Sequence, residues 1–236
     1  KALSYNVQQV KADEISGIKD ANFINSLNGK VAGVTINSSS SGVGGASKVV
    51  MRGAKSIEQS SNALYVIDGI PMYNFGGGGG MEFDSRGATE SIADINPDDI
   101  ESMSLLTGPS AAALYGYEGA NGVVLITTKK GRADKTTVTY SNNTTFSDPM
   151  MMPKFQNTYG NMTGEMMSWG LETDKRYDPA NFFNTGSNVS NALSLSTGND
   201  KSQSYISVAT TNATGIMPNN DYDRYNFSFR NTTNFL

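Results

Sequence analysis

Aromatic and polar residues alternate strictly near the end of the chain. Aromatic residues occupy every second position, at Tyr225, Phe227 and Phe229. Polar residues fill the positions between and after them, at Asn226, Ser228 and Arg230. Because successive side chains of a strand point to opposite faces, this pattern predicts a β-strand with one apolar and one polar face. Such a strand suits either a barrel with lipid outside and a watery lumen inside, or a soluble sandwich.

The composition also favours a chain of strands and turns. The 236 residues include 25 glycines, and hydrophobic residues make up 37%. Cysteine and histidine are both absent, which removes disulfides, thiolate chemistry, histidine bases and nearly all transition-metal sites from this chain. We expect no metal and no other cofactor. The net charge of −4 provides no basic field for nucleic acid, which is therefore not an expected partner.

A membrane-spanning helix is not expected. Such a helix needs about 18 or more consecutive apolar residues, and the chain has no run of that length. Transmembrane strands need only about 10 residues with one lipid-facing side, so this observation does not exclude a membrane protein.

The first part of the chain, residues 1–132, reads as short strands and small helices. Short helices are expected at Asn22–Leu27, after Pro97, and from Ser110, whose hydroxyl would cap a helix that ends at Gly116. Strands are expected in the β-branched or apolar runs Lys48–Arg52, Leu64–Ile67, Met103–Leu106 and Val123–Thr128. Asp68-Gly69 would form a turn.

The second part, residues 133–236, reads as roughly four strands with one long connection. Further alternation occurs at Val138/Tyr140, Leu193/Leu195 and Ile206/Val208. Residues 198–201, with the sequence GNDK, would form a tight turn between two strands. Asp148–Asn184 contains three prolines, clustered methionines and the single tryptophan, so a long loop is expected there.

The acidic residues nominate no catalytic or metal site. Two sets of carboxylates offer oxygen ligands, namely Asp94, Asp98 and Asp99, or Asp221 and Asp223. Neither set matches a calcium-binding loop, so we interpret them as solvated carboxylates. No pair of acids stands out as a general acid and base, and Glu101 is assigned a structural role. We therefore do not expect an enzyme.

Five motifs in order carry a family resemblance. They are GKVAGVTI near Val31, VVMRG at residues 49–53, LYVIDGIP at 64–71, DINPDDIESMSLLTG at 94–108, and AAALYG followed by ANGVVLITTKKG up to Gly131. Together they resemble the plug of the SusC/RagA family of TonB-dependent outer-membrane transporters. The resemblance implies an α+β plug, mainly β with small helices, followed by antiparallel strands of a transmembrane β-barrel.

The resemblance also implies a setting and partners. In this family the plug lies inside the lumen of a multi-pass barrel in the outer membrane of a Gram-negative bacterium, typically a member of the Bacteroidota. The partners would be a SusD-like surface lipoprotein, TonB acting through an upstream TonB box, outer-membrane lipid, and a glycan or peptide substrate. Such plugged barrels have about 22 strands, and four cannot close one, so we expect the chain to be a piece of a longer polypeptide.

Two plug loops would face the cargo by the same resemblance, Ala54–Ser61 and Met72–Arg86. The second carries aromatic rings and hydrogen-bonding groups, namely Tyr73, Asn74, Phe75, Glu82, Phe83 and Asp84. This mixture suits sugars and peptides alike, although the same residues could instead pack the loop itself.

Arg52 is the expected contact between plug and barrel. Where plugs outside this family commonly carry a basic residue before Gly-Pro, this chain has Thr107, so Arg52 is left to pair with carboxylates on the inner barrel wall. The alternative role of Arg52 is a local surface ion pair.

Two functions remain open for a chain of this kind. The first is SusC-like, TonB-dependent import of large nutrients, with the plug gating the lumen. The second is a SusC-like barrel that serves as a structural or assembly component of a larger outer-membrane complex. The plug motifs do not separate them.

Overall fold

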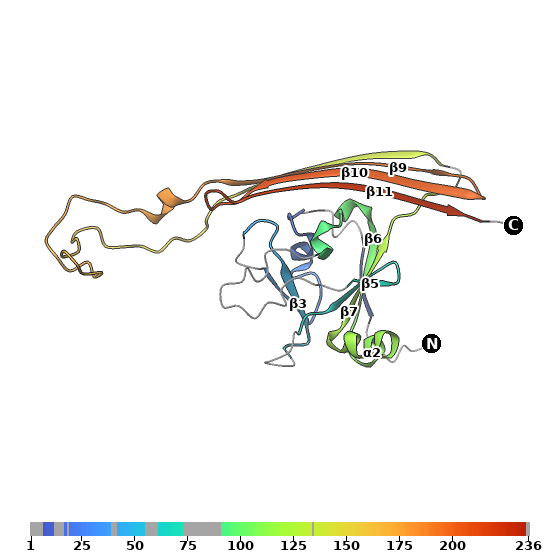
Figure 1. Ribbon diagram of the computed structural model, residues 1–236, viewed down its shortest axis with the longest axis horizontal. Coiled ribbons are helices and arrows are strands. Elements are labelled where there is room, and N and C mark those ends of the chain that lie inside the picture. Colours follow the sequence, from blue (N-terminus) through green and yellow to red (C-terminus); the bar gives the residue numbers. More distant parts are fainter. Residues whose placement is uncertain are drawn as a thin grey trace.

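The computed structural model describes residues 7–11, 17, 19–38, 42–54, 61–72, 91–133 and 135–234. Residues 7–133 form a compact N-terminal unit of short strands and helices. Residues 135–234 form a long antiparallel sheet that lies across one side of that unit, together with an arm that extends beyond the sheet (Figure 1). We call these parts the N-terminal unit and the wall sheet.

A five-stranded sheet forms the centre of the N-terminal unit, in the order β1-β6-β7-β4-β5. Its strands are β1 (Val7–Lys11), β4 (Leu64–Ile67), β5 (Ile70–Met72), β6 (Ile100–Leu106) and β7 (Val123–Thr128). The β4–β7 pair is parallel and the other pairs are antiparallel. A separate two-stranded sheet consists of β2 (Val34–Ser38) and β3 (Ser47–Met51). The predicted strands correspond to β3, β4, β6 and β7, with β6 beginning three residues earlier than predicted, whereas β1 and β5 were not predicted.

The helices of the N-terminal unit are short. They are η1 (Phe23–Leu27), η2 (Ser91–Asp94), η3 (Pro97–Asp99), α2 (Pro109–Tyr115) and η4 (Gly116–Asn121). Side chains of Asn22 and Asn96 cap η1 and η3 by accepting hydrogen bonds from backbone N–H groups two residues later. The expected cap at Ser110 was wrong. The N-cap is Gly108 because Pro109, which has no N–H to leave unpaired, already occupies the first helical turn.

Both hydrophobic clusters of the described residues lie in the N-terminal unit. Among its fully buried side chains are Phe23 and Ile24 of η1, Tyr65 of β4, Met103 of β6 and Ile126 of β7. Among the described residues, neither hydrophobic cluster contains a residue after Ile126. The N-terminal unit is therefore held together by its own buried apolar surface.

The wall sheet has the order β11-β10-β9-β8 and is antiparallel throughout. Its strands are β8 (Thr137–Ser147), β9 (Gly186–Gly198), β10 (Ser202–Thr214) and β11 (Asp221–Thr233). The Asn199 side chain closes the tight turn between β9 and β10 by accepting hydrogen bonds from the N–H groups of Lys201 and Ser202. Both the four strands and this turn confirm the prediction from sequence.

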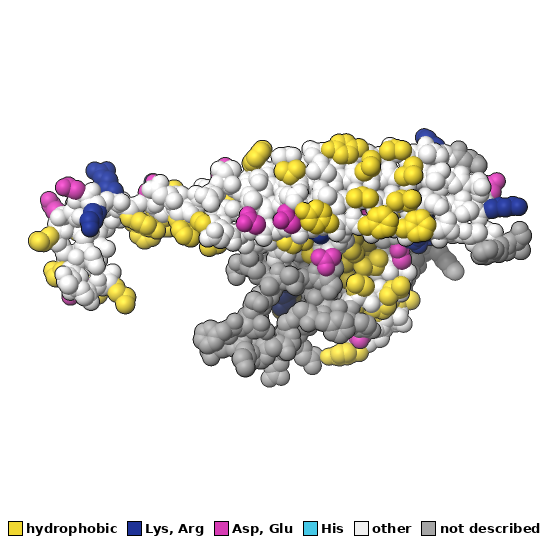
Figure 2. Space-filling view, turned by 45° about the horizontal axis from the view of Figure 1, so that its top comes forward, with side chains coloured by type: hydrophobic (Ala, Val, Ile, Leu, Met, Phe, Trp, Pro, Cys, Tyr) yellow, Lys and Arg dark blue, Asp and Glu magenta, His cyan; other side chains and the backbone are white. Residues whose placement is uncertain are grey.

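The two faces of the wall sheet differ as the alternation predicts. On the outer face, apolar side chains are aligned across neighbouring strands, in the rows Val138–Leu195–Ile206–Phe229 and Tyr140–Leu193–Val208–Phe227. Figure 2 shows such side chains spread over the exposed face of the sheet. The opposite face carries polar and small side chains and is turned toward the N-terminal unit.

The connection between β8 and β9 is a long arm, as expected. It extends well past the ends of the strands (Figure 1) and contains the short helix η5 (Pro179–Phe182) and one isolated bridge, Tyr159–Glu172. Its methionines and its tryptophan are largely exposed, at Met150, Met151, Met166, Met167 and Trp169. Within the described parts of the chain, no helix has the length and apolar character needed to cross a membrane.

Candidate functional site

The contact between the N-terminal unit and the wall sheet is polar. Four inward-facing side chains of β11 at alternate positions each bond the N-terminal unit, namely Arg224, Asn226, Ser228 and Arg230. We call these four residues the β11 contact row. Residues two apart on a strand lie about 7 Å apart, so the row extends for about 20 Å.

Asp99 is the most heavily bonded anion of this contact. It ends η3, and only 5% of its surface is exposed. Its carboxylate accepts hydrogen bonds from Tyr205 Oη at 2.9 Å, Ser207 Oγ at 2.7 Å and Ser228 Oγ at 2.9 Å. A buried carboxylate needs such donors, because removing its charge from water without compensating hydrogen bonds costs on the order of several kcal/mol. Three hydroxyl groups of the wall sheet thus hold one side chain of the N-terminal unit.

Arg224 provides the matching buried cation, which is 8% exposed. Its Nη1 donates to the carbonyl oxygen of Ala21 at 3.1 Å and to that of Ala93, and its Nη2 donates to Thr211 Oγ1 at 3.2 Å. Asn226 donates to the carbonyl oxygen of Asp94. The last carbonyl groups of a helix accept no hydrogen bond from within the helix. Here Arg224 and Asn226 donate to the last two carbonyl oxygens of η2, those of Ala93 and Asp94.

Lys19 joins the N-terminal unit to β8 and β9, the two wall strands farthest from β11. Its ammonium group lies 2.7 Å from Asp98 Oδ2 and 2.6 Å from Ser141 Oγ of β8. Asn188 of β9 donates a 2.9 Å hydrogen bond to the Lys19 carbonyl oxygen. The ammonium group is buried, so its pairing with Asp98 is shielded from solvent.

The interpretation of Asp98 and Asp99 as solvated carboxylates was therefore wrong. Asp98 pairs with Lys19, and Asp99 is buried against β10 and β11. Asp94 is exposed, as expected. The sequence could not show this difference, because the donors that bury Asp99 are more than 100 residues away along the chain.

Asp68 and Arg230 form an ion pair at the last position of the contact row. Their closest atoms lie 2.8 Å apart, and Asp68 Oδ2 also accepts a 2.6 Å hydrogen bond from Thr128 Oγ1. Asp68 lies in the predicted Asp-Gly turn. Burial alone would raise the pKa of Asp68, but the hydrogen bonds from Thr128 and the charge of Arg230 together lower it below its ordinary value.

A glycine-rich segment of the N-terminal unit, Gly42–Gly45, packs under the connection between β10 and β11. The Val43 N–H donates to Asn220 Oδ1 at 3.0 Å. Gly42 and Gly44 have φ angles of +95° and +75°, and a Cβ atom at either position would lie within 2.5 Å of Asn220 or Tyr222 atoms. Only glycine combines this backbone conformation with this close approach.

The predicted site residues fall in different places. Tyr73, Asn74, Phe75, Glu82, Phe83 and Asp84 lie outside the described residues, as does most of the Ala54–Ser61 loop. Arg52 is exposed, and its guanidinium group lies near Gly108 at the start of α2. The helix α2 lies on the side of the N-terminal unit away from the wall sheet (Figure 1). Among the described residues Arg52 forms no ion pair, and its pairing with the barrel stays a prediction.

Sequence reasoning missed the residues that do make the contact. Arg224 and Arg230 carried one available signal, since both lie on the polar side of the alternating strand. For Asp98 and Asp99 the signal was their position in the DINPDDI motif. Neither signal identifies the partner atoms, which are backbone carbonyls and hydroxyl groups brought together only by the fold.

Comparison with known proteins gives a consistent answer. Residues 1–123 match the family model described as the TonB-dependent Receptor Plug Domain. The TonB-dependent receptor SusC of Bacteroides thetaiotaomicron is 29% identical over 99% of this chain and 23% of its own length. The TonB-dependent receptor P3 of Formosa agariphila is 33% identical over 94% of this chain and 21% of its own length. The chain thus spans less than a quarter of either relative.

Solved structures give the same fold. The structure of the RagAB peptide importer in the closed-closed state superimposes on the whole of this chain with a TM-score of 0.77, at 20% identity, and the match covers 29% of the RagAB chain. The N-terminal unit corresponds to a plug and the wall sheet to the first barrel strands, left as an open sheet. The chain belongs to the family of TonB-dependent receptor plug domains.

Proposed function

We propose that this chain is the plug and first barrel strands of a SusC-like transporter that imports large nutrients across the outer membrane. The plug would close the lumen at rest, and TonB, acting on a TonB box upstream in the full protein, would displace it. The proposal is supported by membership of the plug family and by similarity to SusC over nearly the whole chain.

One observation carries the proposal, namely the polar contact between the wall sheet and a plug that has an apolar core of its own. The plug has its own apolar core, whereas the described side-chain bonds between plug and wall are hydrogen bonds and the Asp68–Arg230 ion pair. Permanent interfaces are more apolar and resemble a domain core that has been cut in half. A contact made of hydrogen bonds can be opened and wetted without exposing a hydrophobic core, as a gate requires.

The strength of the bonds between plug and wall sets the free energy that TonB would have to supply to separate them. A neutral hydrogen bond contributes a net ~1 kcal/mol, and one to a charged group about 1.5–3 kcal/mol. The β11 contact row has its bonds arranged along one strand, so a pulling force can break them one after another. The plug would then leave the wall in steps, and the free-energy cost of each step would be far smaller than that of unfolding the plug core.

The wall sheet would face outer-membrane lipid with its apolar rows. Its two described ends differ: β9 and β10 are joined by a tight turn, whereas β8 and β9 are joined by the long arm. In outer-membrane barrels short turns face the periplasm and longer loops face the outside. We therefore place the arm and the Gly42–Gly45 segment on the extracellular side, where a SusD-like lipoprotein would cover the lumen.

The cargo class proposed is a glycan or an oligopeptide. Cargo would meet the plug loops that contain Tyr73, Asn74, Phe75, Glu82, Phe83 and Asp84. Arg52 would contact a part of the barrel wall that another segment of the full-length protein contributes. The scaffold alternative receives no support from the contact between plug and wall, since a permanent scaffold has no need of a separable plug.

Energised uptake by cells that express the full-length protein tests this function. Labelled oligosaccharides and peptides are supplied to the expressing strain, to the same strain without TonB, and to the strain treated with a proton uncoupler. We expect uptake of one cargo class to require both TonB and the proton gradient. Uptake that is equal in all three cultures would overturn the import function.

A further inference from the structure

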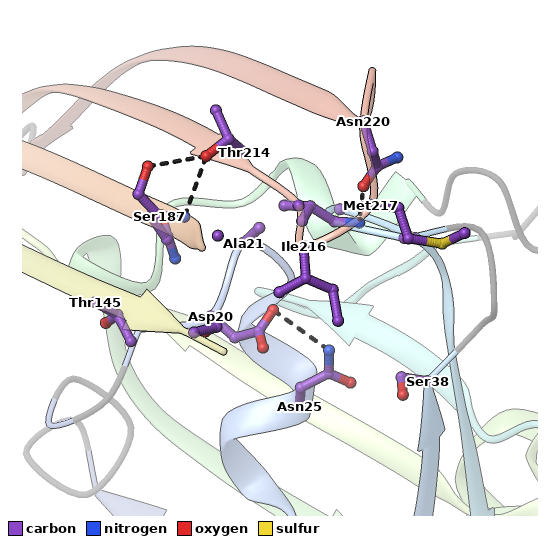
Figure 3. Close-up of a pocket in the computed structure, with 18 of the residues that line it drawn as sticks. Asp20, Ala21, Asn25, Ser38, Thr145, Ser187, Thr214, Ile216, Met217 and Asn220 are labelled. Carbon is purple, nitrogen blue, oxygen red and sulfur yellow. Dashed lines mark hydrogen bonds between the residues drawn. The ribbon is translucent and has the colours of Figure 1, made fainter. Parts of the chain in front are cut away.

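A cavity of about 480 Å³ lies between the plug and the loop ends of the wall strands. The plug contributes Asp20, Asn25 and the Gly42–Gly45 segment, and the wall contributes Ser187, Thr214 and Ile216. Figure 3 shows Asp20 and Asn25 of the plug beside Ser187, Thr214 and Ile216 of the wall. This volume lies within the range of ligand pockets, about 300–1,000 Å³. We call it the junction cavity.

The junction cavity carries one carboxylate that no described cation neutralises. Asp20 Oδ1 accepts hydrogen bonds from the Asn22 N–H at 3.0 Å and from Asn25 Nδ2 at 3.4 Å. Among the described residues, no Lys or Arg side chain pairs with Asp20. The adjacent cation, Lys19, is used by Asp98 and Ser141. Asp20 is thus held in position by two donors while its charge remains available.

Part of the lining of the junction cavity is apolar. Ile216 and Met217, from the connection between β10 and β11, line it together with Phe183. In Figure 3 the Ile216 side chain points into the space between Asp20 and Ser38. A ligand that fits would present a positively charged donor to Asp20 and a small apolar group to Ile216.

These features favour a peptide over a glycan. A free peptide N-terminus is an ammonium group bonded to a carbon that carries a side chain, which matches a cavity lined by a carboxylate and by apolar side chains. Sugar sites instead use broad aromatic faces for stacking, and Phe183 is the single aromatic residue among the described lining residues. An ammonium group also makes a charge-assisted hydrogen bond, which is roughly twice as strong as that of a neutral hydroxyl.

We propose that the junction cavity binds the N-terminal ammonium group of peptide cargo, with Asp20 as its anchor. This inference rests on the proposed import function, for which it selects peptides as the substrate class. A peptide held there touches both the plug and the wall. It also lies one residue from Lys19, whose hydrogen bond to Ser141 of β8 is part of the contact that must open.

Substitution of Asp20 by Asn tests the effect of the negative charge on binding without disturbing the local fold. Asp20→Asn keeps an oxygen that can accept from the Asn22 N–H, while it removes the negative charge. Asp200→Asn is the matched control, since Asp200 is an exposed carboxylate in the tight turn at the other end of the strands. Both variants are made in the full-length protein, purified from outer membranes with whatever partner lipoprotein accompanies it.

Equilibrium dialysis measures the binding of three probes. These are a random-sequence pentapeptide pool, the same pool acetylated at the N-terminus, and maltoheptaose. We expect the wild type and Asp200→Asn to bind the free pool equally, and Asp20→Asn to bind it at least about tenfold more weakly. Acetylated peptides should bind weakly to all three proteins.

Three results would overturn the proposal. The first is equal binding of the free pool by Asp20→Asn and the wild type. The second is equal binding of free and acetylated peptides by the wild type. The third is Asp20-dependent binding of maltoheptaose without binding of peptides.

The uptake experiment separates failure of the cavity from failure of the import function. TonB-dependent peptide uptake with no effect of Asp20→Asn on affinity would leave import standing and remove the cavity. Asp20-dependent binding with uptake that ignores TonB would leave the cavity standing and remove energised import.

Discussion

Asp99 and Ser207 lie 108 residues apart in the chain, and Ser207 Oγ donates a 2.7 Å hydrogen bond to Asp99 Oδ2. The bond joins η3 of the plug to β10 of the wall. Tyr205 and Ser228 donate to the same carboxylate. One plug side chain is thereby tied to two neighbouring wall strands, which makes Asp99 the focus of the contact that a gate must break.

Removal of the Asp99 carboxylate should loosen the plug without unfolding its core. Asp99→Ala leaves three hydroxyl donors unpaired, and each unsatisfied buried group costs about 1–3 kcal/mol. Hydrogen exchange of η3 and of the Lys129 N–H, which donates to the Asp99 carbonyl oxygen, should become at least about tenfold faster in the full-length protein. Asp94→Ala is the control, because Asp94 is exposed and nearby. Equal exchange in the two variants would refute this role of Asp99.

Replacement of Arg224 should weaken the same contact from the wall side. Arg224→Met keeps much of the side-chain volume but leaves the carbonyl groups of Ala21 and Ala93 without their donor, at a cost of about 1–3 kcal/mol. Protease cleavage within the plug should begin at a lower urea concentration than in the wild type. Arg230→Met, at a half-exposed position, should have a smaller effect. An effect of Arg230→Met as large as that of Arg224→Met would contradict the importance of burial.

The Asp68–Arg230 ion pair should fail only in acid. Because the folded-state pKa of Asp68 is lowered, its stabilising effect is fully present above the ordinary pKa of 3.8 and is lost as the pH falls through the lower folded value. Hydrogen exchange at the Thr128 N–H, which donates to Asp68 Oδ1, should stay constant from pH 7 to about 5 after correction for intrinsic rates. Its protection should fall only below about pH 4, and Asp68→Asn should abolish this step. Loss of protection near neutral pH would contradict the lowered pKa.

The close approach of Gly44 to Tyr222 should not tolerate a methyl group. Gly44→Ala would place Cβ 2.5 Å from the Tyr222 ring, so the Gly42–Gly45 segment must shift and the Val43–Asn220 hydrogen bond should break. Overpacking of this kind costs roughly 1–3 kcal/mol. Gly53→Ala is a matched control, since Gly53 has φ of +81° with no neighbouring atom within 4 Å of the added Cβ. Thermal unfolding should separate the two variants, and equal losses would show that backbone strain alone is responsible.

The sequence predicted the elements of this fold better than its contacts. Alternation between Phe227 and Ser228 indicates which face of β11 is apolar, because a strand has a fixed period of two. The same pattern is silent on what the polar face meets. Arg224 bonds backbone carbonyls, which carry no residue-specific signal, and Asp99 is buried only because β10 and β11 return across η3. Local rules fix strands and turns, whereas the site depends on packing between distant segments.

A reversible cross-link between plug and wall tests the central claim, that import requires the plug to leave β11. Asp68→Cys and Arg230→Cys replace an ion pair whose closest atoms lie 2.8 Å apart, in full-length protein from which any other cysteines have been removed by substitution. A short linker that reacts with thiols and contains a disulfide then joins them in living cells. We predict that linked cells bind cargo but do not import it, and that reduction of the linker restores import to the rate of the unlinked double variant. Import at an undiminished rate with the linker in place would contradict the account.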